Sequence, residues 1–256
     1  MRLRKTLLSA GLLAASTLGA GGVFAVEIHV LSAGAVQEAE KAIAEDFREA
    51  TGNKVTFTVG TVGQIQQKLK SGAPADVIVD SATALEQLEK AGDVRARSGV
   101  GLGRIGIGVG VREGAPTPDI STLEKFKDAI LKAKSLTYLD PGTGASSGIA
   151  TAKILQDLGI AEDVAKKTKL TQSGYSADRV ASGEVELAIQ NVSEITPVKG
   201  VKLAGMLPAP LQVYTAYGAG VATKSVNPKE ATDFIRFLAR AEASARWKEA
   251  GIEPAH

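Results

Sequence analysis

Four short segments of the sequence combine glycine with hydroxyl-bearing residues in a way that suits an anion. They are residues 32–35, 60–63, 140–148 and 174–178. Glycine lets the backbone approach a ligand closely, and serine and threonine add hydrogen-bond donors. Each segment alone could equally be a turn with a helix cap. Because each one follows a predicted strand, we favour one shared binding site.

Residues 140–148 carry the clearest signal of the four segments. They contain three glycines together with the hydroxyls of Thr143, Ser146 and Ser147. The segment lacks the Gly-Lys-Ser or Gly-Lys-Thr ending of a P-loop, and its glycines do not have the spacing of a dinucleotide fingerprint. The pattern therefore indicates a site for a small anion.

The elements that must position these segments follow an α/β pattern. Short β-branched runs alternate with amphipathic helical stretches, which predicts a largely parallel sheet. The carboxyl ends of parallel strands meet at one edge, where helix N-termini also converge. The predicted strands are 27–31, 55–59, 76–79, 102–111, 135–139, 168–171, 185–189 and 213–222, and the predicted helices include 36–50, 62–69, 121–133, 149–158, 228–239 and 241–250.

Two stretches have the character of crossings between lobes. Glycine recurs through residues 102–111, and Pro208 and Pro210 precede the last predicted strand. We expect hinges near residues 103–110 and 205–210. The predicted fold class is α/β, with two lobes, a ligand cleft between them and two crossover strands. Lobe 1 would contain residues 26–105 and 214–256, and lobe 2 residues 106–213.

Helix dipoles alone cannot hold an anion tightly. Each helix N-terminus contributes about 0.3 to 1 kcal/mol, whereas micromolar affinity needs about 8 kcal/mol. Hydroxyls or an arginine must supply the remainder. Arg104 and Arg179 are the arginines that we favour, and Arg104 is the better candidate because glycines and aliphatic residues flank it.

The first 25 residues have the features of an export signal. Three cations among the first five residues precede an apolar stretch over residues 7–18, and residues 23–25 provide a cleavage site. The apolar stretch is shorter than the roughly 20 residues that span a bilayer. We therefore expect a mature chain that begins at Val26 and is free in the periplasm.

Composition excludes several classes of function. Removing the three cations of the signal takes the formal net charge from +2 to −1, which argues against nucleic acid as a partner. The chain has no cysteine, so disulfides and thiolate chemistry are excluded. Its only histidines are His29 and His256, which excludes a multi-histidine metal site. We expect a monomer without metal or cofactor.

Three landmarks carry a resemblance to a known family. They are Gly72-Ala73-Pro74-Ala75-Asp76-Val77, Asp140-Pro141 with the loop that follows, and the helix 234–238 with Gly251-Ile252-Glu253-Pro254. The whole mature chain resembles the periplasmic molybdate-binding protein family. The resemblance implies the type 2 periplasmic binding protein fold and a role in an ABC-type importer, with a permease as partner.

The resemblance also implies positions for the ligand. Family members hold molybdate with two serine hydroxyls, backbone amides and a tyrosine, and the matching positions here are Ala35, residues 61–63 and Asn191. These departures favour a dicarboxylate or tricarboxylate over an oxyanion. The candidate ligand-binding residues are Ser32, Gly34, Ala35, Thr61, Val62, Arg104, Thr143, Ser146, Ser147, Tyr175, Arg179 and Asn191.

An enzymatic alternative stays open. The sequence is similar to a divergent branch of this family that includes periplasmic aconitate isomerase, which implies an allylic proton shift that needs a general base and acid but no cofactor. The candidate proton carriers are Tyr138, Tyr175, Asp178 and Glu194. A transport receptor, an isomerase and a sensor subunit that docks on a membrane partner are thus the three hypotheses.

Overall fold

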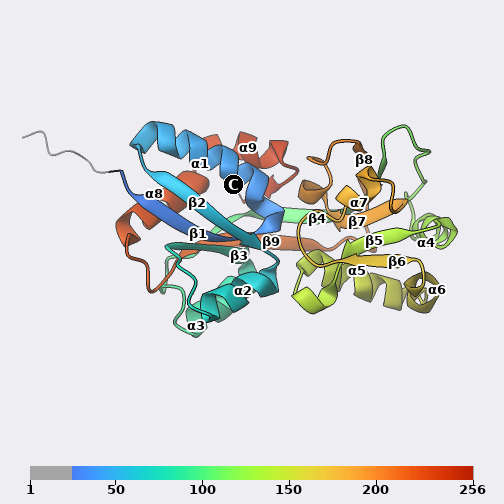
Figure 1. Cartoon of the computed structure of the whole chain (residues 1–256), viewed down its shortest axis with the longest axis horizontal. Helices are drawn as coiled ribbons and strands as arrows, with labels where there is room; N and C mark the ends of the chain where they lie inside the picture. The colour runs from blue at the N-terminus through green and yellow to red at the C-terminus, as the bar shows by residue number, and fades with distance from the viewer. Residues whose placement is uncertain (1–24, 256) are drawn as a thin grey trace, which may run out of the picture.

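The computed structural model describes residues 25–255, which form two lobes lying side by side along the long axis of the molecule (Figure 1). The predicted export signal, except for its last residue, lies outside the described residues. The strands form one sheet in the order β2 (Lys54–Gly60), β1 (Glu27–Ala33), β3 (Val77–Ser81), β9 (Tyr214–Val221), β4 (Val100–Arg112), β7 (Leu187–Asn191), β5 (Leu136–Leu139) and β6 (Thr168–Thr171). Two further strands, β8 (Val201–Met206) and β10 (Glu253–Pro254), pair with β4.

Lobe 1 is a sheet covered by helices on both faces. Strands β1, β2 and β3 are parallel, whereas β9 runs antiparallel to both β3 and β4. One face is covered by α1 (Gln37–Thr51), α8 (Pro228–Leu238) and α9 (Ser244–Glu249), and the other by α2 (Val62–Lys70) and α3 (Ala82–Lys90) (Figure 1). The sheet is therefore mixed and not largely parallel, because the two crossing strands run against their neighbours.

The C-terminal helices return to lobe 1, as the sequence indicates. The ring of Phe47 on α1 packs edge-on against Phe234 and Phe237, with both centroids 5.2 Å away. Trp247 on α9 is buried, and its indole N–H donates to the backbone oxygen of Leu238 at 2.9 Å. Aromatic packing thus fixes the end of the chain on α1.

The recognisable segment around Asp76 has a structural role. One carboxylate oxygen of Asp76 accepts hydrogen bonds from the Ser225 hydroxyl at 2.7 Å and from the backbone N–H groups of Val226 and Asn227, both at 3.1 Å. The other accepts from the backbone of His29 at 3.0 Å. Asp76 therefore ties the entry of β3 to the entry of α8.

Lobe 2 repeats the layered arrangement on a smaller scale. Strands β5, β6 and β7 are parallel and β4 runs against β7. The helices of this lobe are α4 (Leu123–Lys132), α5 (Ser146–Asp157), α6 (Ala161–Ala165) and α7 (Asp178–Ala181). Residues of α4, α5 and α6 share one buried apolar cluster, and α7 contributes to another. Each lobe therefore has its own core.

Strand β4 belongs to both lobes. Its first half pairs with β9 and β10, and its second half pairs with β7 and β8. The change of partner falls between Gly106, which pairs with Tyr214, and Ile107, which pairs with Asn191. The chain returns to lobe 1 at the start of β9. These are the two crossover strands that the sequence predicts.

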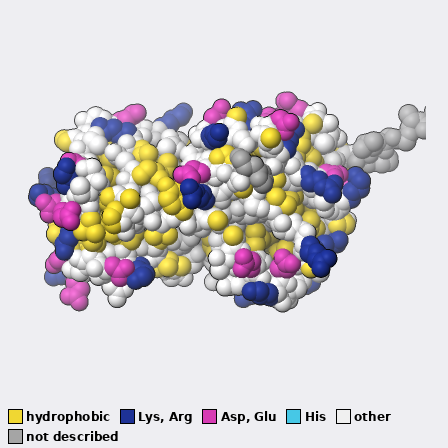
Figure 2. Space-filling model, turned by 180° about the vertical axis from the view of Figure 1, so that it is seen from behind, with side chains coloured by type: hydrophobic (Ala, Val, Ile, Leu, Met, Phe, Trp, Pro, Cys, Tyr) yellow, Lys and Arg dark blue, Asp and Glu magenta, His cyan; other side chains and the backbone are white. Residues whose placement is uncertain are grey.

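The face of the molecule drawn in Figure 2 shows no broad field of one charge. Figure 2 shows acidic and basic side chains interspersed over the rear of both lobes, with hydrophobic side chains gathered over one lobe. Among the residues that the structure describes, no helix is long and apolar enough to cross a membrane.

Candidate functional site

A cavity of about 290 Å³ lies between the two lobes. Both lobes contribute, through strand-end loops that are distant in the sequence. The lining residues are Ala33, Gly34, Ala35, Gln37, Val59, Gly60, Thr61 and Val62 from lobe 1, Leu139, Ala145, Ser146, Ser147, Ser173, Gly174, Asn191 and Glu194 from lobe 2, and Tyr217 from β9. The four segments singled out in the sequence therefore converge on one space.

Lobe 1 presents two backbone turns to the cavity. Strand β1 runs directly into a single 3-10 turn, η1 (Gly34–Val36), and β2 runs into α2. Thr61 caps α2, because its hydroxyl accepts from the backbone of Gln64 while the Gln64 side chain accepts from the backbone of Thr61. Lobe 1 thus offers mainly backbone groups.

Lobe 2 presents the start of α5. The turn η2 (Pro141–Thr143) follows β5, and α5 begins at Ser146 with Ala145 as its N-cap. Within the described chain no side chain caps this helix end. Its first-turn N–H groups and the positive end of its dipole are therefore available to an anion.

Glu194 is the ionisable carboxyl group of the cavity wall. It ends the short turn η3 (Val192–Glu194), is only 4% exposed, and accepts a hydrogen bond from the Asn191 side chain at 2.9 Å through Oε2. Its other oxygen, Oε1, lies toward the opposite lobe, 3.6 Å from where a Cβ on Gly34 would be. Burial raises the pKa of the Glu194 carboxyl from 4.5 to about 8. The Glu194 carboxyl is therefore mostly protonated at neutral pH.

Tyr217 is a cavity residue that the sequence does not single out. It lies on β9, is buried, and its hydroxyl is 2.9 Å from the Ser146 Oγ. Burial, together with the nearby Glu194, raises the pKa of the phenol. The sequence does place Tyr214 and Tyr217 in the second crossing strand. The alternation of apolar residues in that strand does not show which of the two faces the cleft.

Direct contacts between the lobes close the cavity on several sides. The Thr61 hydroxyl donates to the backbone oxygen of Thr143 at 2.6 Å, and the Gly63 N–H donates to the backbone oxygen of Gly144 at 3.3 Å. The Ser193 hydroxyl donates to the backbone oxygen of Ala35 at 2.6 Å. Each of these hydrogen bonds joins one lobe to a backbone oxygen of the other, so the structure is a closed form.

A model of the bacterial extracellular solute-binding protein family matches residues 28–253. The chain belongs to this family. An aconitate isomerase from a Pseudomonas species is 31% identical over 255 residues, which are 97% of this chain and 96% of that protein. The molybdate-binding protein ModA of Azotobacter vinelandii is 32% identical over 207 residues, which are 77% of this chain and 74% of that protein.

A solved structure agrees with this membership. The periplasmic molybdate-binding protein of Azotobacter vinelandii superposes with a TM-score of 0.75 at 20% identity, covering 88% of this chain and 98% of that one. At that identity the likeness shows the fold alone. It confirms the type 2 periplasmic binding protein fold, and the family match and the two relatives confirm the resemblance stated from the sequence.

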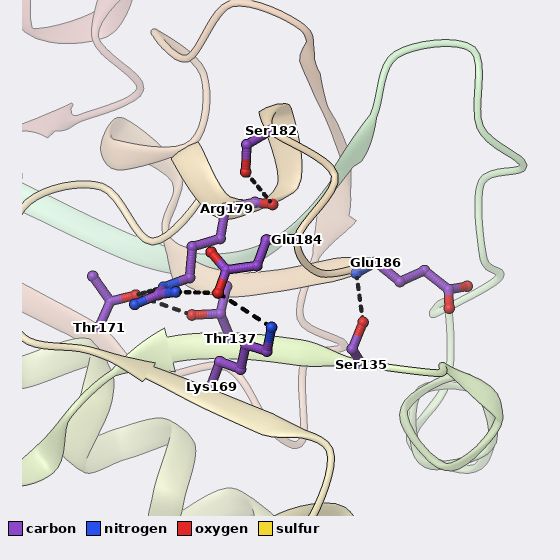
Figure 3. A network of polar contacts seen from close by, with 8 residues as sticks. All are labelled: Ser135, Thr137, Lys169, Thr171, Arg179, Ser182, Glu184 and Glu186. Atoms are coloured by element: carbon purple, nitrogen blue, oxygen red, sulfur yellow. Dashed lines mark hydrogen bonds and ion pairs between the residues drawn. The ribbon is translucent and has the colours of Figure 1, made fainter.

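Arg104 and Arg179 lie outside the cavity of this solute-binding protein. Arg104 pairs with Glu253 at 2.6 Å and lies over the ring of Tyr214, on the surface of lobe 1. Arg179 donates to Thr171 at 3.0 Å and pairs with Glu184 at 2.6 Å, within a polar network on lobe 2 (Figure 3). Both guanidinium groups are engaged by their own lobe.

The hydroxyls of Ser32 and Thr143 are hydrogen-bonded within the protein and do not face the cavity. Ser32 is fully buried, and its hydroxyl donates to Glu40 on α1, underneath the first cavity loop. The Thr143 hydroxyl donates to the backbone oxygen of Asp140 at 2.7 Å, so only the backbone of this residue reaches the opposite lobe. Neither residue lines the cavity.

The tyrosines proposed as proton carriers also lie outside the lining. The Tyr175 hydroxyl accepts from the Gln37 side chain at 2.5 Å and donates to Glu38 at 3.0 Å, which joins the lobes beside the cavity. Tyr138 packs against the core of lobe 2. Asp178 is exposed at the start of α7. Among the four candidate proton carriers, Glu194 is the one that belongs to the cavity lining.

The donor set of the cavity is unusual for an anion site. No lysine or arginine belongs to its lining, as far as the described residues go. Attraction for a negative ligand must come from backbone N–H groups and from hydroxyls, and Glu194 adds no opposing negative charge while it holds its proton. Such a site can bind an anion and exchange a proton with it.

Proposed function

We propose that this solute-binding protein catalyses an allylic proton shift on an unsaturated tricarboxylate, interconverting cis- and trans-aconitate. The observation that carries the proposal is the position of Glu194, a buried carboxyl group that faces the opposite lobe from the wall of an anion-attracting cavity. An acid whose pKa is near the working pH can both remove and return a proton. A simple anion receptor has no need of such a group.

The reaction needs one proton to leave and one to arrive. Ionised Glu194 removes a proton from the methylene carbon, and the electron pair of that C–H bond enters the adjoining double-bond system. The double bond shifts by one position as the far carbon accepts a proton from the now protonated Glu194. Atoms and charge balance without an oxidant, a reductant or a cofactor.

The cavity can stabilise the intermediate charge. Proton removal spreads negative charge onto a conjugated carboxylate, and preorganised N–H and O–H donors aimed at such charge lower the barrier. The uncapped end of α5 and the hydrogen-bonded hydroxyls of Ser146 and Tyr217 are available for this purpose. The cavity volume of about 290 Å³ is compatible with a small organic acid.

The full-length similarity to an aconitate isomerase supports the same substrate class. The test is proton NMR of trans-aconitate and of cis-aconitate with the purified protein in deuterated buffer. We expect conversion of one isomer into the other, with exchange of methylene protons for deuterium. Glu194→Gln should abolish both signals.

Glu40→Gln is the matched control for Glu194→Gln. Glu40 is also fully buried, and burial raises the pKa of its carboxyl to about 8, but it lies on α1 outside the cavity. The Glu40 variant should retain turnover. Tight binding of aconitate by the wild-type protein with neither conversion nor exchange would contradict the isomerase and leave a binder.

A second candidate is a receptor that delivers a small anion to an ABC-type permease. The family membership and the closed two-lobed form favour it. For either function we propose a periplasmic monomer, cleaved after residue 25. N-terminal sequencing of protein from the periplasm tests the cleavage, and a co-purifying permease together with inert tight binding would select the receptor.

A further inference from the structure

Three of the helical elements that line the cavity, η1, α2 and α5, differ in how their first turns are satisfied. The start of α2 is capped by Thr61 and Gln64, and η1 is a single 3-10 turn. The 12-residue helix α5 has no side-chain cap within the described residues. The first turn of α5 therefore has N–H donors that no side-chain cap uses.

The hydroxyls around the cavity differ in the same way. Those of Thr61 and Ser32 are engaged within or between the lobes, and those of Ser146 and Tyr217 bind each other. Ser147, on the first turn of α5, is 1% exposed and lines the cavity, yet its Oγ has no hydrogen-bond partner in the described part of the chain.

An unpaired buried hydroxyl is costly and is uncommon in folded proteins. The cost is recovered if a ligand supplies the missing acceptor. We infer that the Ser147 hydroxyl, together with the uncapped first turn of α5, donates to a carboxylate oxygen of the ligand. Ser147 is then a side chain of lobe 2 that anchors the anion, in a cavity whose lining lacks lysine and arginine among the described residues.

Helix α5 provides a matched control for this inference. Thr151 lies one turn beyond Ser147, is also 1% exposed, and its Oγ1 likewise has no partner among the described residues, but Thr151 does not line the cavity. Ser147→Ala and Thr151→Val each delete one buried, unpaired hydroxyl from the same helix. Neither change removes a hydrogen bond, so the ligand-free melting temperature should stay unchanged or rise slightly for both.

Ligand binding should separate the two variants. We would measure the Kd of ligand-stripped protein for trans-aconitate, cis-aconitate, citrate, sulfate and molybdate by calorimetry. For each anion that binds the wild-type protein, Ser147→Ala should weaken binding by tenfold or more, since a hydrogen bond to a charged group is lost. Thr151→Val should stay within twofold of the wild type.

The outcomes distinguish this inference from the proposed function, on which it rests only in taking the cavity as an anion site. Aconitate binding without turnover overturns the isomerase and still tests Ser147. Equal affinity of Ser147→Ala and the wild type, or an equal loss in both variants, overturns the role of Ser147. A wild-type protein that binds none of these anions overturns both.

Discussion

At the scale of single residues, the protein keeps two glutamates uncharged for different purposes. Glu194 and Glu40 both have a pKa of about 8, and in both cases burial is the main cause. Their locations differ, because Glu194 lines the cavity and Glu40 is bonded to Ser32 beneath it. The raised pKa should therefore affect stability at both residues and reactivity at Glu194.

Turnover should depend on the ionisation of Glu194. The base form removes the first proton, so kcat/KM for aconitate should rise with pH and level off above about 8, the pKa of Glu194 in the free protein. Tyr217 is the other titratable group of the cavity wall, and its raised pKa keeps it protonated over this range. Initial rates between pH 6 and 9 provide the measurement, and a flat profile would argue against Glu194 as the base.

Stability should depend on the ionisation of Glu40. Its pKa is 4.5 in the unfolded chain and about 8 in the folded protein. The folded state therefore holds its proton more tightly, and the free energy of unfolding should fall as pH rises from about 4.5 through about 8. Each pKa unit corresponds to about 1.4 kcal/mol, so the loss reaches up to roughly 5 kcal/mol.

Glu40→Gln should remove the contribution of Glu40 to this pH dependence, since the amide cannot ionise, whereas the contributions of Glu194 and Asp80, whose pKa burial also raises, should remain. We expect the variant to melt at a higher temperature than the wild type at pH 9, with the difference shrinking toward pH 5. Calorimetric melting curves at both pH values provide the comparison. A difference that is equal at the two pH values would mean that Glu40 does not titrate in this range.

At the scale of elements, closure depends on two glycines that meet across the lobes. A Cβ on Gly63, in the first turn of α2, would lie 2.6 Å from the backbone oxygen of Thr143 and 2.9 Å from the Cα of Gly144. Gly144 also has a left-handed φ of 71°. Backbone meets backbone at this point, so no side chain can move aside.

Gly63→Ala should hold the lobes apart. Alanine has the higher helix propensity, by about 1 kcal/mol, so α2 itself should not suffer. We expect at least a tenfold loss in anion affinity and a larger radius of gyration by small-angle scattering with ligand present. Gly99→Ala is the control, because a Cβ there has no neighbour within 4 Å. Wild-type affinity in the Gly63 variant would show that this contact is not needed for closure.

The sequence predicts most elements because their apolar periodicity is strong. The predicted helix 36–50 and strand 55–59 correspond to α1 and β2 within a residue or two. Strand β8 was missed, since its residues are mostly half-buried and carry a lysine and a glycine. The predicted helix 241–250 is in fact a 3-10 turn (Ala241–Ala243) followed by α9. Periodicity reports burial on one face, and these segments have little of it.

The cavity was harder to predict than the fold. Glycines and hydroxyls after strands identified Gly34, Thr61, Ser146 and Ser147, because strand ends of an α/β sheet converge by topology. The arginines could not be placed, since the sequence does not reveal that Glu253 and Glu184 reach them first. Side-chain pairing between distant segments has no local signature.

At the scale of the whole molecule, binding and stability should be coupled. A ligand in the cavity should contact both lobes. At a free concentration of 100 times its Kd, it should stabilise the folded state by about 2.7 kcal/mol. For a chain of this length that corresponds to a rise in melting temperature of about 5 to 10 °C. Calorimetry should give one transition that shifts as a unit, whereas a shift confined to one of two transitions would mean that a single lobe holds the ligand.

Gly106 on β4 pairs with Tyr214 on β9 at the place where the chain passes between the lobes. The chain leaves lobe 1 and re-enters it at two points that face each other across a β-ladder, about 5 Å apart. Residues 107–213, which lie between these two points, are thus an insertion between two strands of lobe 1. We expect that a short hairpin turn in place of residues 107–213 could join β4 to β9 and leave lobe 1 as a smaller protein with half of the site, and circular dichroism of that variant would test whether it folds.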